Sequence, residues 1–233
     1  MLIDLHAHTS GISACCQATA EETLKTTKEH GLDGIVLTNH YQKYYVKDGN
    51  APAFAQRYWE EFLHTEKVGK ELGMRVLFGI EVTMTERTII HLLVYGVGKE
   101  FLDAHPFMYD YSQEELYRAV KDYGGVLVQA HPYRNGASLL DPQFLDGVEI
   151  NCHSQYNTSE APKVMADAKK HGLFLTCGGD YHADTYRPHC GMILPDSIQD
   201  GKELGQYLAT SPTLTLCIHE PFEKDWYLYT QER

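Results

Sequence analysis

The chain has 233 residues, with 20 Lys and Arg, 32 Asp and Glu and 13 His, so its formal net charge is −12 when the histidines are neutral. This excess of acid argues against binding along long nucleic acids, which requires a basic surface. No apolar run reaches the roughly 18 residues of a membrane-spanning helix, and the apolar start runs straight into polar residues without the pattern of a signal peptide, so we expect a cytoplasmic protein.

Strands and amphipathic helices are predicted to alternate along the whole chain, residues 1–233, which we expect to form a single domain. The predicted elements are, in chain order, strand 1–5, helix 21–30, strand 34–38, helix 53–72, strands 75–80 and 88–97, helix 112–123, strands 125–129 and 147–150, helix 159–171, strand 174–177, helix 201–209, and strand or tail at 213–218 and 226–229. This alternation is typical of βα units with a parallel sheet. A closed barrel of eight such units takes about 250 residues, so about seven strands predict a barrel with fewer units.

Side chains that commonly bind metals follow five of the predicted strands. They are His6 and His8, then His40, Glu81, His131, and finally Asp180 with His182. The carboxyl ends of parallel barrel strands share one face, where active sites of such folds lie. The i, i+2 spacing of His6 with His8 and of Asp180 with His182 directs both members of each pair to one side. The sequence therefore predicts a metal site at this end of the barrel.

His91 lies inside an apolar strand, where a buried imidazole needs a partner. Alone it is interpreted as a hydrogen-bonded core residue, but beside Glu81 it becomes a candidate ligand. One ion takes about three or four protein ligands, so the complete set predicts two or three divalent ions. Histidine and carboxylate together suit zinc, manganese or iron.

The remaining histidines and the cysteines give weaker signals. A structural or solvent-exposed role is expected for five histidines: His30, His64, His105, His171 and His219. His153 and His189 follow predicted strand ends, so contact with substrate or metal and a structural role both stay open. The six cysteines form no disulfide framework and no CxxC pair, as expected in a reducing compartment.

The site motifs resemble those of the PHP family, the polymerase and histidinol phosphatase domain. The matching motifs, in the family's order, are Asp4-Leu5-His6-Ala7-His8-Thr9, Leu37-Thr38-Asn39-His40, Gly79-Ile80-Glu81, His91 in His-Leu-Leu-Val-Tyr-Gly, Ala130-His131-Pro132, Glu149-Ile150-Asn151 and Gly179-Asp180-Tyr181-His182. The resemblance implies a distorted (β/α)7 barrel with up to three divalent ions.

The resemblance also implies how the ligands are shared out. It assigns His6, His8, Glu81 and Asp180 to one ion, Glu81 as a bridge with His91 and His131 to a second, and His40 with His182 to a third. Residues 10–17 lack the His or Asp that the family usually places after its HxH motif. Cys15 is the nearest replacement and Cys16 the next, although a purely apolar role for Cys15 is an equal alternative. Asn39 also stands where the family usually has Asp, so a carboxylate behind the ligands is lost.

The hypothesis for function is hydrolysis of a small phosphate monoester or of a nucleotide or oligonucleotide end. Glu81 would bridge two ions that activate water, and Asp180 or a neighbouring His would orient the nucleophile or protonate the leaving group. Arg134 and Arg187 are candidate phosphate clamps and His153 a candidate substrate contact. The loop 41–52 is the predicted substrate-selecting segment. Hydrolysis of an amide or lactone, and a metal-binding module without activity, are the alternatives. The sequence does not indicate the oligomeric state.

Overall fold

The structure is a computed structural model that describes residues 1–86, 90–153, 160–183, 190–219 and 223–233. Its strands are β1 (Leu2–Ala7), β2 (Gly34–Leu37), β3 (His40–Tyr41), β4 (Arg75–Thr83), β5 (His91–Tyr95), β6 (Val126–Gln129), β7 (Gly147–Asn151), β8 (Phe174–Gly178), β9 (Gly191–Ile193), β10 (Thr213–Ile218) and β11 (Tyr227–Glu232). Its α-helices are α1 (Ala20–Glu29), α2 (Ala51–Leu72), α3 (Lys99–Ala104), α4 (Gln113–Asp122), α5 (Ala161–His171) and α6 (Gly201–Thr210).

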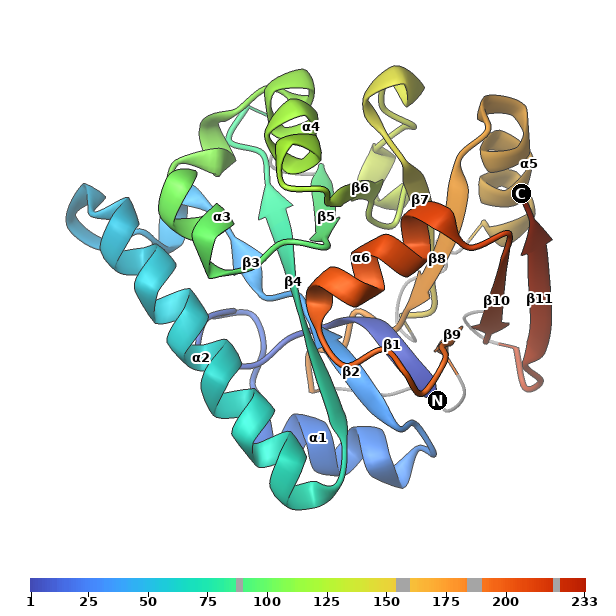
Figure 1. Cartoon of the computed structure of the whole chain (residues 1–233), viewed down its shortest axis with the longest axis horizontal. Coiled ribbons are helices and arrows are strands. Elements are labelled where there is room, and N and C mark those ends of the chain that lie inside the picture. Colours follow the sequence, from blue (N-terminus) through green and yellow to red (C-terminus); the bar gives the residue numbers. More distant parts are fainter. Residues whose placement is uncertain (87–89, 154–159, 184–189, 220–222) are drawn as a thin grey trace.

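Seven strands form a nearly closed barrel, in the order β1-β2-β4-β5-β6-β7-β8 (Figure 1). The seam between β8 and β1 is joined at its carboxyl end by backbone hydrogen bonds. Asp180 N–H donates to the His6 carbonyl at 2.7 Å, and His8 N–H donates to the Tyr181 carbonyl at 3.3 Å. The predicted fold class, a distorted seven-stranded barrel, is therefore confirmed.

Strand β5 departs from the predicted parallel arrangement, because it runs antiparallel to both of its neighbours, β4 and β6. The connection from β4 spans only residues 84–90. A parallel crossover needs a dozen or more residues, so this short connection forces the chain to turn back. The reversal has a consequence for the site. His91, expected in mid-strand, is the first residue of β5 and lies at the end of the barrel where the parallel strands finish, opposite Thr83 of β4.

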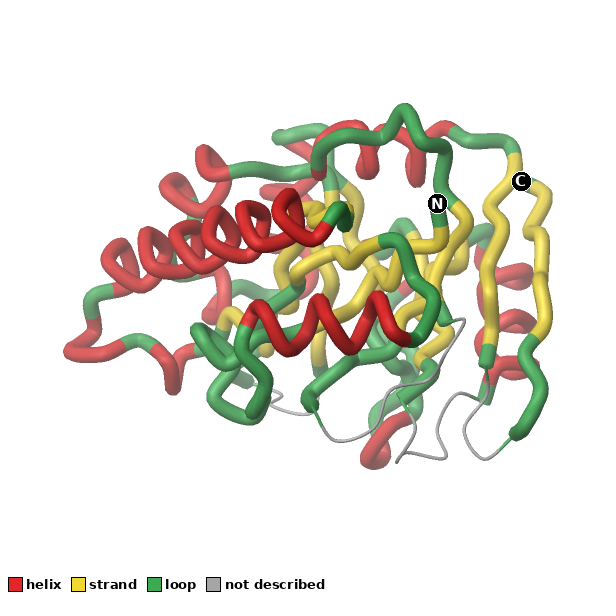
Figure 2. Tube along the Cα trace, turned by 90° about the horizontal axis from the view of Figure 1, so that it is seen from below, coloured by secondary structure: helices red, strands yellow, loops and turns green. Residues whose placement is uncertain are grey.

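The helices lie around the strands (Figure 2), and their ends follow local sequence signals. Helix α4 begins with the expected capping box, in which Ser112 and Glu115 each accept a hydrogen bond from the other's backbone N–H. Helix α2 ends at Gly73, whose φ of 68° is left-handed and suits glycine. His30 caps α1, its Nδ1 lying 2.8 Å from the Thr26 carbonyl oxygen, as expected for a structural histidine.

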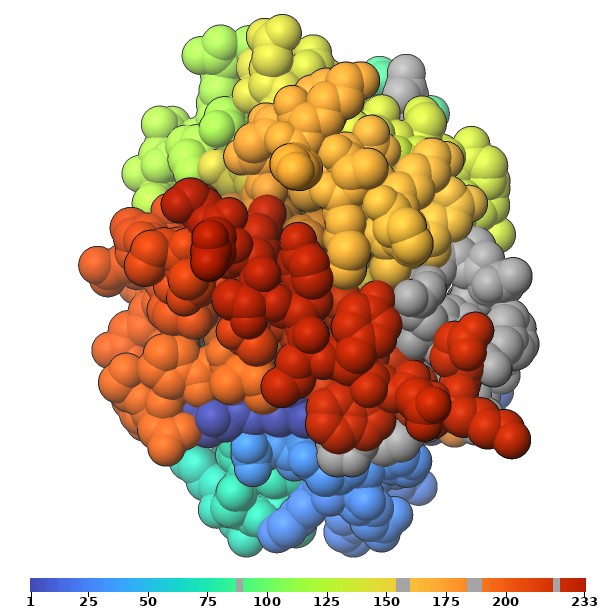
Figure 3. Space-filling view, turned by 90° about the vertical axis from the view of Figure 1, so that its right-hand side faces the viewer, coloured from blue at the N-terminus to red at the C-terminus, as the bar shows by residue number. Residues whose placement is uncertain are grey.

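The C-terminal strands extend the sheet beyond the barrel. Strands β9, β10 and β11 continue the sheet from β1, each antiparallel to its neighbour. Figure 3 shows the C-terminal residues, in red, on the side of the molecule that faces the viewer. Gln231 of β11 accepts a hydrogen bond from the Leu175 N–H of β8 at 2.8 Å, so these strands lie beside the other side of the seam. All six cysteines are free thiols. Within the described ranges, no helix is both long and apolar enough to cross a membrane.

Candidate metal centre

Glu81 lies at the centre of the site, fully buried near the end of β4. Its two carboxylate oxygens are within 3.4 Å of nitrogens from five histidine rings: Oε1 lies 3.3 Å from His6 Nε2, 2.7 Å from His91 Nδ1 and 3.3 Å from His131 Nε2, while Oε2 lies 3.4 Å from His8 Nε2 and 2.6 Å from His40 Nδ1. One carboxylate thus faces ligand-type atoms from several strands, which is the arrangement of a bridging group.

The first ligand group is His6, His8, Glu81 and Asp180, all four buried. Asp180 Oδ1 lies 3.3 Å from His6 Nε2 and 3.1 Å from His8 Nε2. Ligand atoms about 2.0–2.2 Å from a tetrahedral ion are about 3.4 Å apart. The spacing of these side chains therefore fits a single ion held by the set that the motif resemblance implied.

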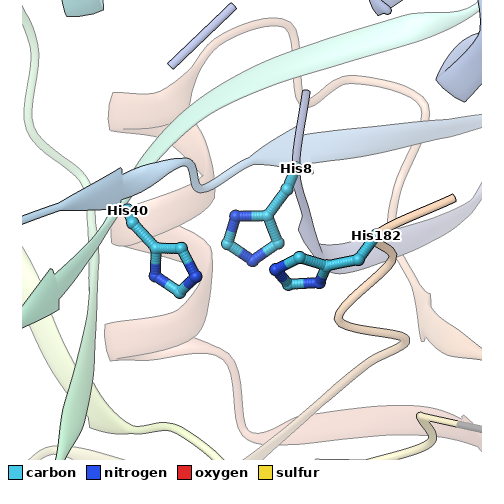
Figure 4. Close-up of side chains that lie close together, drawn as sticks. All are labelled: His8, His40 and His182. Atoms are coloured by element: carbon cyan, nitrogen blue, oxygen red, sulfur yellow. The ribbon is translucent and has the colours of Figure 1, made fainter. Parts of the chain in front are cut away.

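Two further groups overlap with the first. His40, Glu81 and His91 offer ligand atoms within 4.8 Å of one another, and His131 lies against the same Glu81 oxygen as His91. His8, His40 and His182 form the third group, and their side chains point toward one another from three different segments (Figure 4). The His8 ring centroid is 4.5 Å from that of His40 and 4.3 Å from that of His182. The three predicted ligand sets thus lie in one continuous cluster.

Several buried atoms of this cluster fit a cation. Among the described residues, His6 Nε2, His40 Nδ1 and Glu81 Oε2 are buried and form no well-aligned hydrogen bond, although His40 Nδ1 and Glu81 Oε2 lie 2.6 Å apart. Such burial is costly unless charge compensates it. Burial alone would raise the pKa of Glu81, yet the charges of His40, His91 and His6 hold that pKa well below its usual value. Burial lowers the pKa of His40, but the neighbouring groups, chiefly Glu81, together raise it by more, so the pKa of His40 is raised to about 10. Protons on His6 and His40, whose pKa values the neighbouring carboxylates raise, thus supply positive charge that divalent ions would replace.

Two of the candidate ligands occupy strained backbone positions. His131 has a φ of 26° and Asp180 a φ of 52°. Non-glycine residues rarely adopt positive φ, and such strain is concentrated at functional sites, where the surrounding structure maintains it. His131 lies two residues after the end of β6, and Asp180 lies two residues after the end of β8. Both therefore lie at the carboxyl ends of barrel strands, where the sequence predicts the site.

Glu149 holds the ligands from behind and received no role from sequence reasoning. Its Oε1 accepts from His6 Nδ1 at 2.8 Å, and its Oε2 accepts from the His131 backbone N–H at 2.9 Å and from Asn151 Nδ2 at 3.1 Å. A carboxylate on Nδ1 fixes a proton there, so Nε2 of His6, once it loses its own proton, would direct its lone pair toward Glu81 and Asp180. The signal available was a buried-strand Glu in the motif Glu149-Ile150-Asn151.

We predict that Glu149→Gln weakens metal binding about 10- to 100-fold without removing a ligand, because neutral glutamine no longer fixes the His6 tautomer. Titration of the metal-free chain with zinc or manganese, followed by calorimetry, measures this change. The exposed Glu71→Gln on α2 is the matched control. Unchanged affinity in Glu149→Gln would show that this carboxylate only supports the fold.

Ser13 and Asn39 orient the other ligand of the HxH motif. Asn39 Oδ1 accepts from the Thr9 backbone N–H and from Ser13 Oγ–H, both at 2.8 Å. Ser13 Oγ in turn accepts from His8 Nδ1 at 3.1 Å and from the His40 backbone N–H at 3.0 Å. Asn39 thus replaces the family's carboxylate with an amide oxygen that still anchors this hydrogen-bond chain. Ser13 gave no signal in the sequence.

The residues predicted to contact substrate differ in position: two are buried near the ligand cluster, and the others lie outside the described residues. Arg134 is buried, with Nη1 on Asp180 Oδ2 and Nη2 on Asn151 Oδ1, so both terminal nitrogens contact protein oxygens. His153 is buried, its ring centroid 6.4 Å from that of His182. Arg187 and His189 lie outside the described residues.

The two neighbouring cysteines differ in position. Cys15 is an exposed residue whose thiol is partly covered. This partial burial would raise the pKa of the thiol, but hydrogen bonds with His182 and His40 lower that pKa to about 6. Tyr45 Oη–H also donates to Cys15 Sγ at 3.8 Å. Cys16 is buried, and its thiol donates to the Ala18 carbonyl at 3.7 Å. Of the two thiols, Cys15 is therefore the one that reaches the third group of histidines.

Comparisons with known proteins agree with this fold. An uncharacterized protein of Methanocaldococcus jannaschii is 29% identical over 163 residues, which cover 64% of this chain and 81% of that protein. A structure from Bifidobacterium adolescentis, described as a candidate metal-dependent phosphoesterase, superposes with a TM-score of 0.58 at 17% identity, over 88% of this chain and 95% of that one. An amidohydrolase from Chromobacterium violaceum with bound sulfate gives a TM-score of 0.61 at 15% identity, over 89% and 97%.

At these identities the solved structures show a shared fold. The family model for the PHP domain matches residues 4–179, which include every candidate ligand except His182 and Asp180. The match begins at the strand that carries His6 and His8 and ends beside Asp180, so it spans the barrel strands that build the cluster. The chain therefore belongs to the PHP domain family.

Proposed function

We propose that the chain is a metal-dependent phosphoesterase that hydrolyses a small phosphate monoester or a nucleotide or oligonucleotide end. The observation that carries the proposal is the buried Glu81 carboxylate, surrounded by five histidine nitrogens within 3.4 Å. Two or three divalent ions of zinc, manganese or iron, when bound by this cluster, supply an activated water and offset charge on the phosphate oxygens.

We propose that Asp180 orients the nucleophile, because one of its oxygens faces the cluster. Burial would raise the pKa of Asp180, but the charges of His6 and Arg134 hold that pKa well below its usual value and keep the carboxylate ionised. Oδ1 faces His6 and His8, while Oδ2 contacts Arg134. Arg134 and its second partner, Asn151, hold the carboxylate in one orientation. We therefore propose that Arg134 mainly positions Asp180. Its guanidinium can also donate a hydrogen bond to a phosphate oxygen of the bound substrate. His153, beside His182, is retained as a substrate contact.

The net charge of −12 supports a small substrate over long nucleic acids, since the cluster rather than the protein surface provides the positive charge. A panel of phosphate esters, a nitroanilide and a lactone, assayed with each metal, tests the reaction class. Turnover of phosphate esters supports the proposal, whereas turnover of the amide or lactone alone favours the amidohydrolase alternative. A fully loaded protein that is inactive on every substrate favours the non-catalytic module.

We further propose that the Cys15 thiolate completes the third ligand group with His40 and His182. Cobalt bound by a thiolate gives an intense sulfur-to-metal charge-transfer absorption in the near ultraviolet, which oxygen and nitrogen ligands lack. We predict this absorption for the cobalt-loaded chain and its loss in Cys15→Ser, with one equivalent less of bound cobalt. Cys16→Ser is the matched control, and an identical spectrum for all three proteins would remove Cys15 from the ligand set.

A further inference from the structure

A pocket of about 260 Å³ is lined by residues that closely follow two of the candidate ligands in the chain, and the proposed mechanism does not use it. It is lined by two short segments, Gln42–Tyr44 and Thr83–Thr85. The first segment follows His40 of β3 and the second follows Glu81 of β4, and His40 and Glu81 pair across these two strands. Thr83 also pairs with His91 of β5. The pocket is therefore attached to three candidate ligands through the backbone that carries them.

Two side chains of this pocket lack partners. The hydroxyl oxygens of Thr83 and Thr85 are buried and have no hydrogen-bond partner within the part of the chain that the structure describes. Thr83 is only 5% exposed. Since alternate strand residues share a face, Thr83 lies on the same side of β4 as Glu81. A buried hydroxyl without a partner is costly, and a bound group that offers a hydrogen bond removes that cost.

The chemistry of the lining limits what can bind. Among the described residues that line it, Lys43 is the only charged one, and its ammonium is paired with Asp110 at 3.1 Å. Tyr44 and Met84 add apolar surface. The volume is just below the roughly 300 Å³ at which pockets for drug-sized ligands begin. The pocket thus suits a neutral group about one ring in size that carries hydroxyls.

We propose that this pocket is the leaving-group subsite and that it selects sugar or polyol phosphates, whose neutral hydroxyls bond to Thr83 and Thr85. The inference rests on the proposed phosphoesterase function and adds the class of substrate. It also gives a physical role to part of the loop 41–52, since residues 42–44 form one wall.

The test compares two kinds of substrate in the metal-loaded chain. Glucose 6-phosphate and glycerol 1-phosphate carry hydroxyls on a ring and on a short chain, whereas 4-nitrophenyl phosphate carries none. In the double variant Thr83→Val with Thr85→Val, the ratio of kcat/KM on the better hydroxylated substrate to kcat/KM on 4-nitrophenyl phosphate should fall about tenfold. Ser at both positions should restore the preference, and Thr213→Val on β10 is the matched control.

Equal losses on both kinds of substrate, or no loss on either, would overturn the subsite. A readout independent of turnover keeps the two proposals distinguishable. In saturation-transfer NMR, free glucose or glycerol should receive signal from the wild-type chain and not from the double valine variant. A chain that hydrolyses no phosphate ester refutes the proposed function. Absence of transfer to both probes refutes the subsite.

Discussion

Replacing Glu81 with Gln should abolish turnover and reduce metal content by at least one equivalent per chain. The carboxylate supplies both of its oxygens to the cluster, Oε1 toward His6, His91 and His131 and Oε2 toward His8 and His40. A glutamine offers one neutral oxygen and an NH₂ that repels a cation. The loss of metal affinity should therefore exceed the roughly 10- to 100-fold typical of residues that only support ligands.

Elemental analysis after dialysis against zinc or manganese measures the metal content, and the phosphate-ester panel measures turnover. Glu71→Gln, which makes the same chemical change on the exposed face of α2, should match the wild type in both. Circular dichroism of the metal-free proteins checks that the barrel is intact. A folded Glu81→Gln protein with full metal content and near-normal turnover would show that Glu81 does not bridge.

Removal of the metals should loosen the barrel at its seam. His6, in β1, and His8, just after β1, lie on one side of the seam. Asp180 and His182, beyond the end of β8, lie on the other side. A ligand present at about 100 times its Kd contributes about 2.7 kcal/mol to stability, and 1 kcal/mol shifts the Tm of a chain of this size by about 2–4 °C. Each ion should therefore raise the Tm by about 5–10 °C.

Hydrogen exchange locates the effect. Chelation should speed exchange of the backbone amides of His8 and Asp180, whose hydrogen bonds join the two sides of the seam, more than exchange at the β4–β5 pairing. Scanning calorimetry with and without a chelator gives the Tm change. If chelation left the Tm unchanged, or speeded exchange evenly over all strands, the ions would contribute little to closure of the barrel.

The general position of the site was predictable because one rule of geometry governs it. Parallel strands of a barrel end on the same face, so His40, Glu81 and His131 could be brought together from their places after apolar strands. The same reasoning placed His6, His8, Asp180 and His182. Helix ends were also predictable, since the capping box of α4 and Gly73 after α2 are local signals.

Contacts between distant segments were not predictable in the same way. Ser13 and Glu149 reach His8 and His6 only because the folded chain brings loop and strand together, and neither residue has a spacing that marks this role. Arg134 was expected to clamp phosphate, but its two contacts with Asp180 and Asn151 depend on the path of the chain after β6. The antiparallel direction of β5 follows from the short connection between β4 and β5, whereas the alternation of strands and helices along the rest of the chain favoured a parallel strand.

The reversal of β5 also affects the order in which the ligand groups can assemble during folding. Glu81 and His91 are separated by 10 residues, whereas His8 and Asp180 are separated by 172. Loop-closure entropy grows with the logarithm of this separation, so joining the distant pair costs about 2.5 kcal/mol more. The β4–β5 hairpin can therefore present Glu81 and His91 together while the ends of the chain are still apart. An ion captured there would be held by a local nucleus, onto which β1 and the segment after β8 dock last.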